Sequence, residues 1–156
     1  MYSKGNNHLL AIVVCIIIAT SSLVGCDWIC HCYIYFENKT SDSILISNVD
    51  SSFYFNLKTP FKVAPRGTIF VVEEEFFDDI PSSSDIPDIM KSAFPGGLII
   101  TFKEGKTLIY SPDSVESQSF SPYTEKSYRC VYVDGPMIGK HHLHAYYEIT
   151  DTILNN

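Results

Sequence analysis

Positive charge is scarce in this chain. It has 11 Lys and Arg residues against 18 Asp and Glu, which gives a formal net charge of −7. An acidic surface repels phosphate groups, so the composition argues against nucleic acid and anionic lipid as direct partners. The sequence also lacks G-x-S-x-G, H-E-x-x-H and a glycine-rich phosphate loop, and so carries no familiar catalytic motif. We therefore expect no enzymatic activity and no cofactor.

No hydrophobic run is long enough to cross a bilayer. The apolar stretch Leu9–Thr20 is shorter than the roughly 20 residues that a spanning helix needs. It follows a polar start whose single charge is Lys4, and small residues come after it. These are the parts of a cleaved secretory signal. Its last residues, 23–26 (LVGC), resemble the bacterial lipoprotein signature, which implies cleavage before Cys26 and fatty acyl chains such as palmitate on that cysteine.

The lipoprotein signature divides the chain into three parts. Residues 1–25 are the expected signal peptide, 26–29 a lipidated end with a very short tether, and 30–156 one domain. Removal of the signal leaves 10 basic and 18 acidic residues, a net charge of −8. Two or three acyl chains make a stable anchor, because each buried methylene contributes about 0.8 kcal/mol. We expect the cell envelope as location, with the outer membrane as its membrane and the exposed side left open. The alternative is an uncleaved helical anchor.

Cysteines are few once this processing is considered. Cys15 leaves with the signal and Cys26 is lipidated, so Cys30, Cys32 and Cys130 remain. An oxidising envelope favours one disulfide and one leftover thiol. We expect Cys130 to pair with Cys32 or with Cys30. The alternative is three buried thiols that act as small hydrophobic side chains.

Alternating apolar and polar residues predict short strands with turns between them. The first two strands are expected to form a hairpin through the turn at 38–42, and residues 60–65 an extended connection. A short helix is expected at 88–94, and one helical turn in the tail. The strands are expected at 30–38, 43–48, 53–57, 68–77, 98–102, 107–110, 127–133 and 142–149.

This pattern predicts an all-β fold, an antiparallel β-sandwich of seven or eight short strands. The alternative is a small, partly open barrel. The order of features, from the lipoprotein signature through N-K-T-S-D-S-I and I-I-T-F-K-E-G-K-T-L-I-Y to the closing Y-Y-E-I-T-D, resembles small lipoproteins of Bacteroidota envelopes. That resemblance implies an immunoglobulin-like sandwich and transfers no active residue.

A histidine cluster is the strongest chemical feature. On a strand, His142 and His144 share one face with Tyr146, while the opposite face is apolar and points inward. Two imidazoles at this spacing can chelate Zn, Cu or Ni, although no third ligand is set by the spacing. His31 and Tyr33 are expected on the corresponding outer face of the first strand. The alternative is an ordinary polar strand face.

Two further clusters are interpreted as structural. Cys30-His31-Cys32 lies on a strand and lacks the helix N-terminus that lowers a thiol pKa, so we expect packing there and no redox chemistry. Glu73–Glu75 with Asp78 and Asp79 lacks the alternating oxygen ligands of a calcium loop. We expect a solvated edge that discourages sheet-to-sheet pairing.

Three tripeptides match the Asp-Ser/Thr-aliphatic pattern on which Bacteroidota envelope proteins carry O-glycans. They predict candidate acceptors at Ser43, Ser114 and Thr152. Chance in a chain rich in Ser and Asp is the alternative.

The leading functional hypothesis is a lipid-anchored, non-enzymatic binding or scaffold module of the envelope, whose partner is an envelope protein or a glycan. Tyr33, Tyr35, Tyr146 and the pair Phe76-Phe77 are the expected contact residues. The second hypothesis is a fimbria-like structural or adhesive subunit assembled by strand addition. The third is a metal-dependent enzyme that uses the cluster His141–His144.

Overall fold

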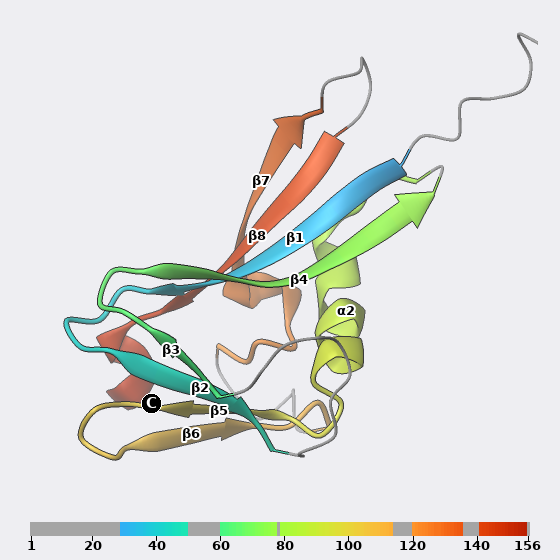
Figure 1. The fold of residues 1–156 in the computed structure, drawn as a ribbon. Coiled ribbons are helices and arrows are strands. Elements are labelled where there is room, and N and C mark those ends of the chain that lie inside the picture. The colour runs from blue at the N-terminus through green and yellow to red at the C-terminus, as the bar shows by residue number, and fades with distance from the viewer. Residues whose placement is uncertain (1–28, 50–59, 78, 114–119, 136–140, 156) are drawn as a thin grey trace, which may run out of the picture.

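The computed structural model describes residues 29–49, 60–77, 79–113, 120–135 and 141–155. Within these residues, eight strands form two four-stranded sheets that pack face to face (Figure 1). The predicted all-β sandwich is thereby confirmed. Sheet A has the order β4 (Thr68–Phe77), β1 (Ile29–Asn38), β8 (His141–Ile149), β7 (Tyr128–Asp134). Sheet B has the order β3 (Phe61–Val63), β2 (Ile44–Asn48), β5 (Leu98–Thr101), β6 (Thr107–Tyr110).

Strand β1 is one of the two central strands of sheet A and shows why the sequence folds this way. Its side chains alternate, and every second one, from Cys30 to Phe36, is buried against sheet B and the helix, as predicted. β1 pairs antiparallel with β4 but parallel with β8. The parallel pair corrects the expectation of a wholly antiparallel sheet. It is possible because β1 and β8 are the first and last strands, and no hairpin turn dictates their direction.

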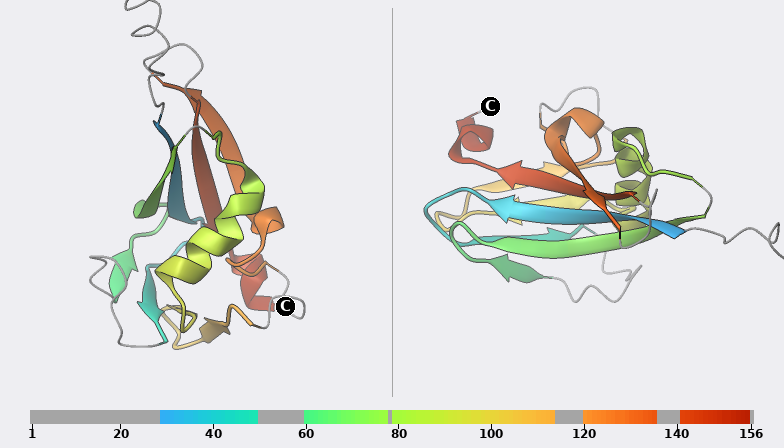
Figure 2. Two further views of the ribbon diagram at one scale, coloured as in Figure 1. Left: turned by 90° about the vertical axis from the view of Figure 1, so that its right-hand side faces the viewer. Right: turned by 90° about the horizontal axis from the view of Figure 1, so that it is seen from above.

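One helix fills the space between the sheets on one side. Helix α2 (Ile86–Ala93) follows a short 3-10 turn, η1 (Ser83–Asp85), and buries its apolar face in the core. Figure 2 shows it lying across the opening between sheet A and sheet B. Ser82 and Asp85 cap the turn, with the Ser82 N–H donating to Asp85 Oδ2 at 2.7 Å. The helix expected at 88–94 is therefore confirmed, and it begins two residues earlier.

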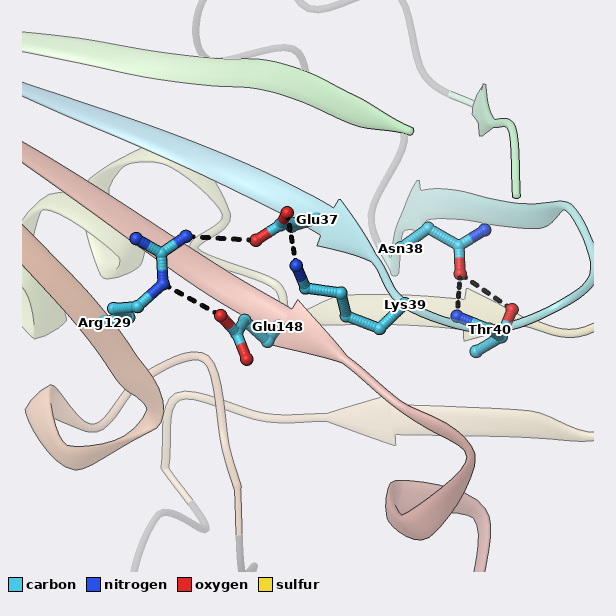
Figure 3. Close-up of polar contacts among 6 residues, drawn as sticks. All are labelled: Glu37, Asn38, Lys39, Thr40, Arg129 and Glu148. Atoms are coloured by element: carbon cyan, nitrogen blue, oxygen red, sulfur yellow. Dashed lines mark hydrogen bonds and ion pairs between the residues drawn. The ribbon is translucent and has the colours of Figure 1, made fainter. Parts of the chain in front are cut away.

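The expected hairpin between β1 and β2 is wrong, because the two strands lie in different sheets. The chain crosses between the sheets at Asn38, whose amide is fully buried. Asn38 Nδ2 lies 3.2 Å from Val63 O and 3.0 Å from Ala64 O. Its Oδ1 accepts from Thr40 N at 3.0 Å and Thr40 Oγ1 at 2.7 Å (Figure 3). The side-chain amide of Asn38 thus connects the end of β1 to the end of β3, where a hairpin would have had backbone hydrogen bonds between β1 and β2.

The other strands begin and end within one residue of the predicted positions, with two exceptions. β3 lies inside the stretch 60–65 that was expected to be a connection, and the strand expected at 53–57 falls outside the described residues. The tail forms the 3-10 helix η4 (Asp151–Asn155) and η3 (Glu125–Ser127) precedes β7. Among the described residues, no helix is both long and apolar enough to span a bilayer.

A candidate binding face on sheet A

The outer side of sheet A carries a continuous group of rings. Register places Tyr33 opposite His144, and Tyr35 between Tyr146 on β8 and Phe70 on β4. The predicted outward direction of the β1 and β8 side chains is confirmed. We call this group the aromatic face; it consists of His31, Tyr33, Tyr35, Phe70, His142, His144 and Tyr146.

The rings of the aromatic face stack on one another. Tyr35 lies 5.0 Å from Tyr146 with an interplanar angle of 15°, and 5.7 Å from His144 at 8°. His31 stacks on Tyr33 at 5.6 Å and 10°. Offset stacking of this kind stabilises each pair by about 1 kcal/mol. Phe70 and His142 are not stacked: Phe70 meets Tyr35 at 62° and His142 meets His31 at 51°. The stacked rings therefore offer a partner their edges and polar tips.

The phenols of Tyr33 and Tyr35 stay protonated at neutral pH. Partial burial raises the pKa of Tyr33, and the Glu73 carboxylate raises it further. Burial also raises the pKa of Tyr35, with a smaller contribution from Tyr146. Both hydroxyls can therefore donate as well as accept hydrogen bonds at the surface.

The three histidines lie together at one end of the face. His31 Nδ1 is 2.7 Å from Glu73 Oε1, and the ring centroids of His31 and His142 are 5.1 Å apart. The backbone N–H of His31 donates to His142 Nδ1 at 3.3 Å. A neutral His142 therefore carries its proton on Nε2. Burial lowers the pKa of His144, and the neighbouring His142 lowers it further.

This arrangement bears on the expected metal site. His142 and His144 share a face as predicted, and His31 lies beside them. A metal ligand must offer a free lone pair. In neutral His142, Nδ1 accepts a hydrogen bond and Nε2 carries the proton, so a metal ion would have to displace one of the two. Among the described residues, no group of three or more His, Cys, Asp or Glu side chains is placed to hold a metal ion.

A charged network borders the aromatic face at its other end (Figure 3). Arg129 Nε donates to Glu148 Oε1 at 2.9 Å, and its terminal nitrogen donates to Glu37 Oε2 at 3.2 Å. Its guanidinium carbon lies 4.4 Å from the Tyr146 ring centroid. A hydrogen bond from Lys39 to Glu37 and the contact with Arg129 lower the pKa of Glu37. Sequence reasoning missed Arg129, although alternation places it on the face opposite Cys130.

The two edges of sheet A differ in chemistry. On β4, Glu73 to Glu75 are exposed at the edge, which confirms the expected charged edge. On β7, Val131, Tyr132 and Val133 are exposed, and among the described strands β7 pairs only with β8. Between Arg129 and Asp134, the middle of β7 carries no charge and no proline, and such a stretch at a sheet edge is open to pairing with another chain.

The expected disulfide is not present in the structure. Cys30, Cys32 and Cys130 are free thiols. Cys130 lies opposite Ala145, which lies opposite Ile34, so β8 separates Cys130 from β1. Two strand spacings amount to about 9 to 10 Å, whereas the Cα atoms of a disulfide lie within about 7 Å of each other. The alternative of free thiols that pack with the core fits the buried Cys30 and Cys32.

The other expected site residues are scattered. Ser43 is partly buried and lines an open hollow of about 460 Å³ together with Asp42 and Lys103, whose Nζ lies 2.8 Å from Asp42 Oδ1. Thr152 is exposed. Phe76 packs against the core, so only Phe77 of that pair is an exposed contact residue. The expected lipidation site Cys26 and the expected acceptor Ser114 lie outside the described residues.

Sequence reasoning found most of the aromatic face but missed Phe70. Its neighbours were predictable from alternation along one strand, whereas Phe70 joins the face only through the register of β4 against β1. Comparison of the chain with protein-family models, with curated proteins and with solved structures finds no match.

Proposed function

We propose that this chain is a lipid-anchored module of the cell envelope that binds a protein partner through the aromatic face. One observation carries the proposal: four aromatic rings and three imidazoles gather on the solvent side of a sheet whose other side is buried. The solvated face of such a sheet is ordinarily polar. Tyr and Arg are the residues that interfaces concentrate at their centres, and Tyr146 with Arg129 provides such a pair.

The stacking favours a protein over a glycan as the partner. A sugar is usually held against a free ring face, and here Tyr35 is stacked with both Tyr146 and His144. Rings that are already packed lose little conformational entropy when a partner covers them. A protein surface can use the ring edges, the phenol hydroxyls and the fixed Arg129 together.

Photo-crosslinking in the native envelope tests this face. A benzoylphenylalanine replaces Phe70, which is 46% exposed on the aromatic face, or Leu45, which is 40% exposed on sheet B. We expect a discrete protein adduct from position 70 and none from position 45. The adduct should disappear in a Tyr35→Ala, Tyr146→Ala double variant. Equal adducts at both positions, or none at 70, would contradict the proposal.

The anchor is tested separately, because it rests on residues 23–26 (LVGC). Cells are grown with an alkyne analogue of palmitic acid, and the protein is purified and labelled by cycloaddition. We expect label on the wild-type chain and none on Cys26→Ala, which should also retain residues 1–25. Label that survives in Cys26→Ala would contradict lipidation at this residue.

A second candidate function is assembly by strand addition, which the uncharged stretch Cys130–Val133 of the β7 edge favours. It predicts that the purified protein self-associates with increasing concentration. Val131→Lys places a charge on this edge and should keep the protein monomeric, whereas Phe70→Lys, on the other edge strand, should leave assembly unchanged. A monomer at all concentrations in sedimentation would contradict this candidate.

A further inference from the structure

The start of β1, where the N-terminal segment joins the domain, lies at the same end of sheet A as the end of β4, the end of β7 and the start of β8. Ile29 at the start of β1 lies opposite Phe77 at the end of β4, and Asp134 at the end of β7 lies opposite His141 at the start of β8. Figure 1 shows these ends at the upper right, beyond sheet B, with β7 and β8 spread apart from β1 and β4. We call this region the strand-end tip.

The strand-end tip is rich in exposed apolar side chains. Four of the ten exposed large hydrophobic residues in the described part of the chain belong to it: Phe77, Ile80, Tyr132 and Val133. Phe77 is 63% exposed, and Ile80 follows it by three residues. Phe77 is the last residue of β4 and Ile80 follows it in the chain, whereas Tyr132 and Val133 lie near the end of β7, the opposite edge strand of sheet A. Phe77 and Ile80, at one corner, are the candidate contact, because neighbouring apolar side chains exposed on a domain surface mark a contact with another phase or molecule.

The few residues between Cys26 and β1 indicate that this contact is with the membrane. Only Asp27 and Trp28 separate Cys26 from Ile29, and three extended residues span about 10 Å. The Cα of Phe77 lies about 5 Å further, because it pairs with Ile29 across an antiparallel ladder. If Cys26 carries the lipid, Phe77 must therefore lie within about 15 Å of the bilayer surface.

We propose that the strand-end tip contacts the bilayer surface itself, with Phe77 and Ile80 inserted among lipid headgroups. This inference rests on the proposed lipid anchor and adds a second, non-covalent membrane contact that orients the domain. Aromatic side chains are favoured at this depth of a membrane. Sheet A would then run away from the membrane, which leaves the aromatic face open on the side.

The charges at the tip select the kind of lipid. Asp134 and Asp79 are exposed there, and the imidazole of His141 lies 2.8 Å from Asp134 Oδ1. Carboxylates repel anionic headgroups. The tip therefore fits a zwitterionic surface such as phosphatidylethanolamine and not one rich in phosphatidylglycerol.

The test uses the purified, lipidated full protein in vesicles of phosphatidylethanolamine with phosphorus-labelled headgroups. Benzoylphenylalanine replaces Phe77 or, as a matched control, Ile109, which is 60% exposed on β6 of sheet B. Light should give several-fold more phosphorus-labelled adduct at position 77 than at 109. The anchor adds no phosphorus, so it does not contribute to the signal. Vesicles of phosphatidylglycerol should give less adduct at position 77.

The possible outcomes distinguish a failure of the tip contact from a failure of the lipid anchor on which it rests. Intact mass of the same sample first establishes whether Cys26 carries acyl chains. With the lipid present, equal adducts at 77 and 109, or a protein adduct at 77 in place of a lipid one, would overturn the tip contact and leave the anchor standing. A mass without lipid would overturn the anchor, and the tip contact with it.

Discussion

Arg129 lies over Tyr146, with the guanidinium carbon 4.4 Å from the ring centroid, and the two residues face each other across the β7–β8 ladder. The same guanidinium donates to Glu37 on β1 and to Glu148 on β8. One side chain therefore connects three strands on the outer side of sheet A. It holds Tyr146 in the stack while its own charge is neutralised by two carboxylates.

Replacement of Arg129 tests how far this network stabilises the face. Arg129→Ala should lower the free energy of unfolding by about 1 kcal/mol, because the ion pairs and the ring contact are all partly exposed and screened. Arg129→Lys should recover little, because an ammonium cannot bridge both carboxylates while lying flat on the ring. Urea titration measures both variants. Lys103→Ala, which removes one exposed pair with Asp42, is the control and should change little.

Replacement of Asn38 should lower the free energy of unfolding more than replacement of Arg129. Asn38→Ala removes the amide that lies near the carbonyls of Val63 and Ala64 and that accepts from Thr40. These buried groups then lack a partner, so unfolding should become easier by about 3 kcal/mol or more. Lys39→Ala, at the neighbouring exposed position, should cost far less. Equal losses in chemical denaturation would show that the turn is not organised by this amide.

Asn38 also shows where prediction from sequence ends. The stretch 38–42 has the residues of a hairpin turn, and local pattern alone favours a hairpin between the strands that flank it. One carbonyl that accepts from Asn38 Nδ2, that of Asp42, lies in the same stretch, but the other two belong to residues 63 and 64, which follow β2 in the chain. Which strand lies beside which is a property of the whole packing, and no periodicity within one segment encodes it.

The faces of single strands were easier to predict. Alternation alone placed Tyr33 and Tyr35 outward and Ile34 inward, since a strand with one buried side permits only one register. The same reasoning placed His142 and His144 outward. The aromatic face as a unit was not predictable, because it needs the parallel pairing of β1 with β8 that brings Tyr35 beside Tyr146.

Thiol reactivity should follow burial. Burial raises the pKa of Cys32 to about 12 and also raises that of the less buried Cys130. Thiolate is the reactive form, so alkylation of the native, unreduced protein should modify Cys130 first and Cys32 only on unfolding. In the processed protein that we propose, without residues 1–25 and with Cys26 acylated, denaturation without reductant should give three reactive thiols, from Cys30, Cys32 and Cys130. Fewer than three, with the number restored by reductant, would mean that a disulfide forms after all.

The pKa of His144 makes the fold sensitive to mild acid. Burial, with a further contribution from His142, holds the pKa of His144 below its usual 6.5. As pH falls through 6.5, the unfolded chain takes up this proton before the folded protein does, so the free energy of unfolding decreases. The decrease ends below the folded pKa, where both states are protonated. His144→Gln removes this group, so its stability should depend less steeply on pH across that window than that of the wild type. Urea titrations at several pH values measure how the free energy of unfolding of each protein depends on pH. Equal dependence in the two proteins would mean that His144 protonates as readily in the folded protein as in the unfolded chain.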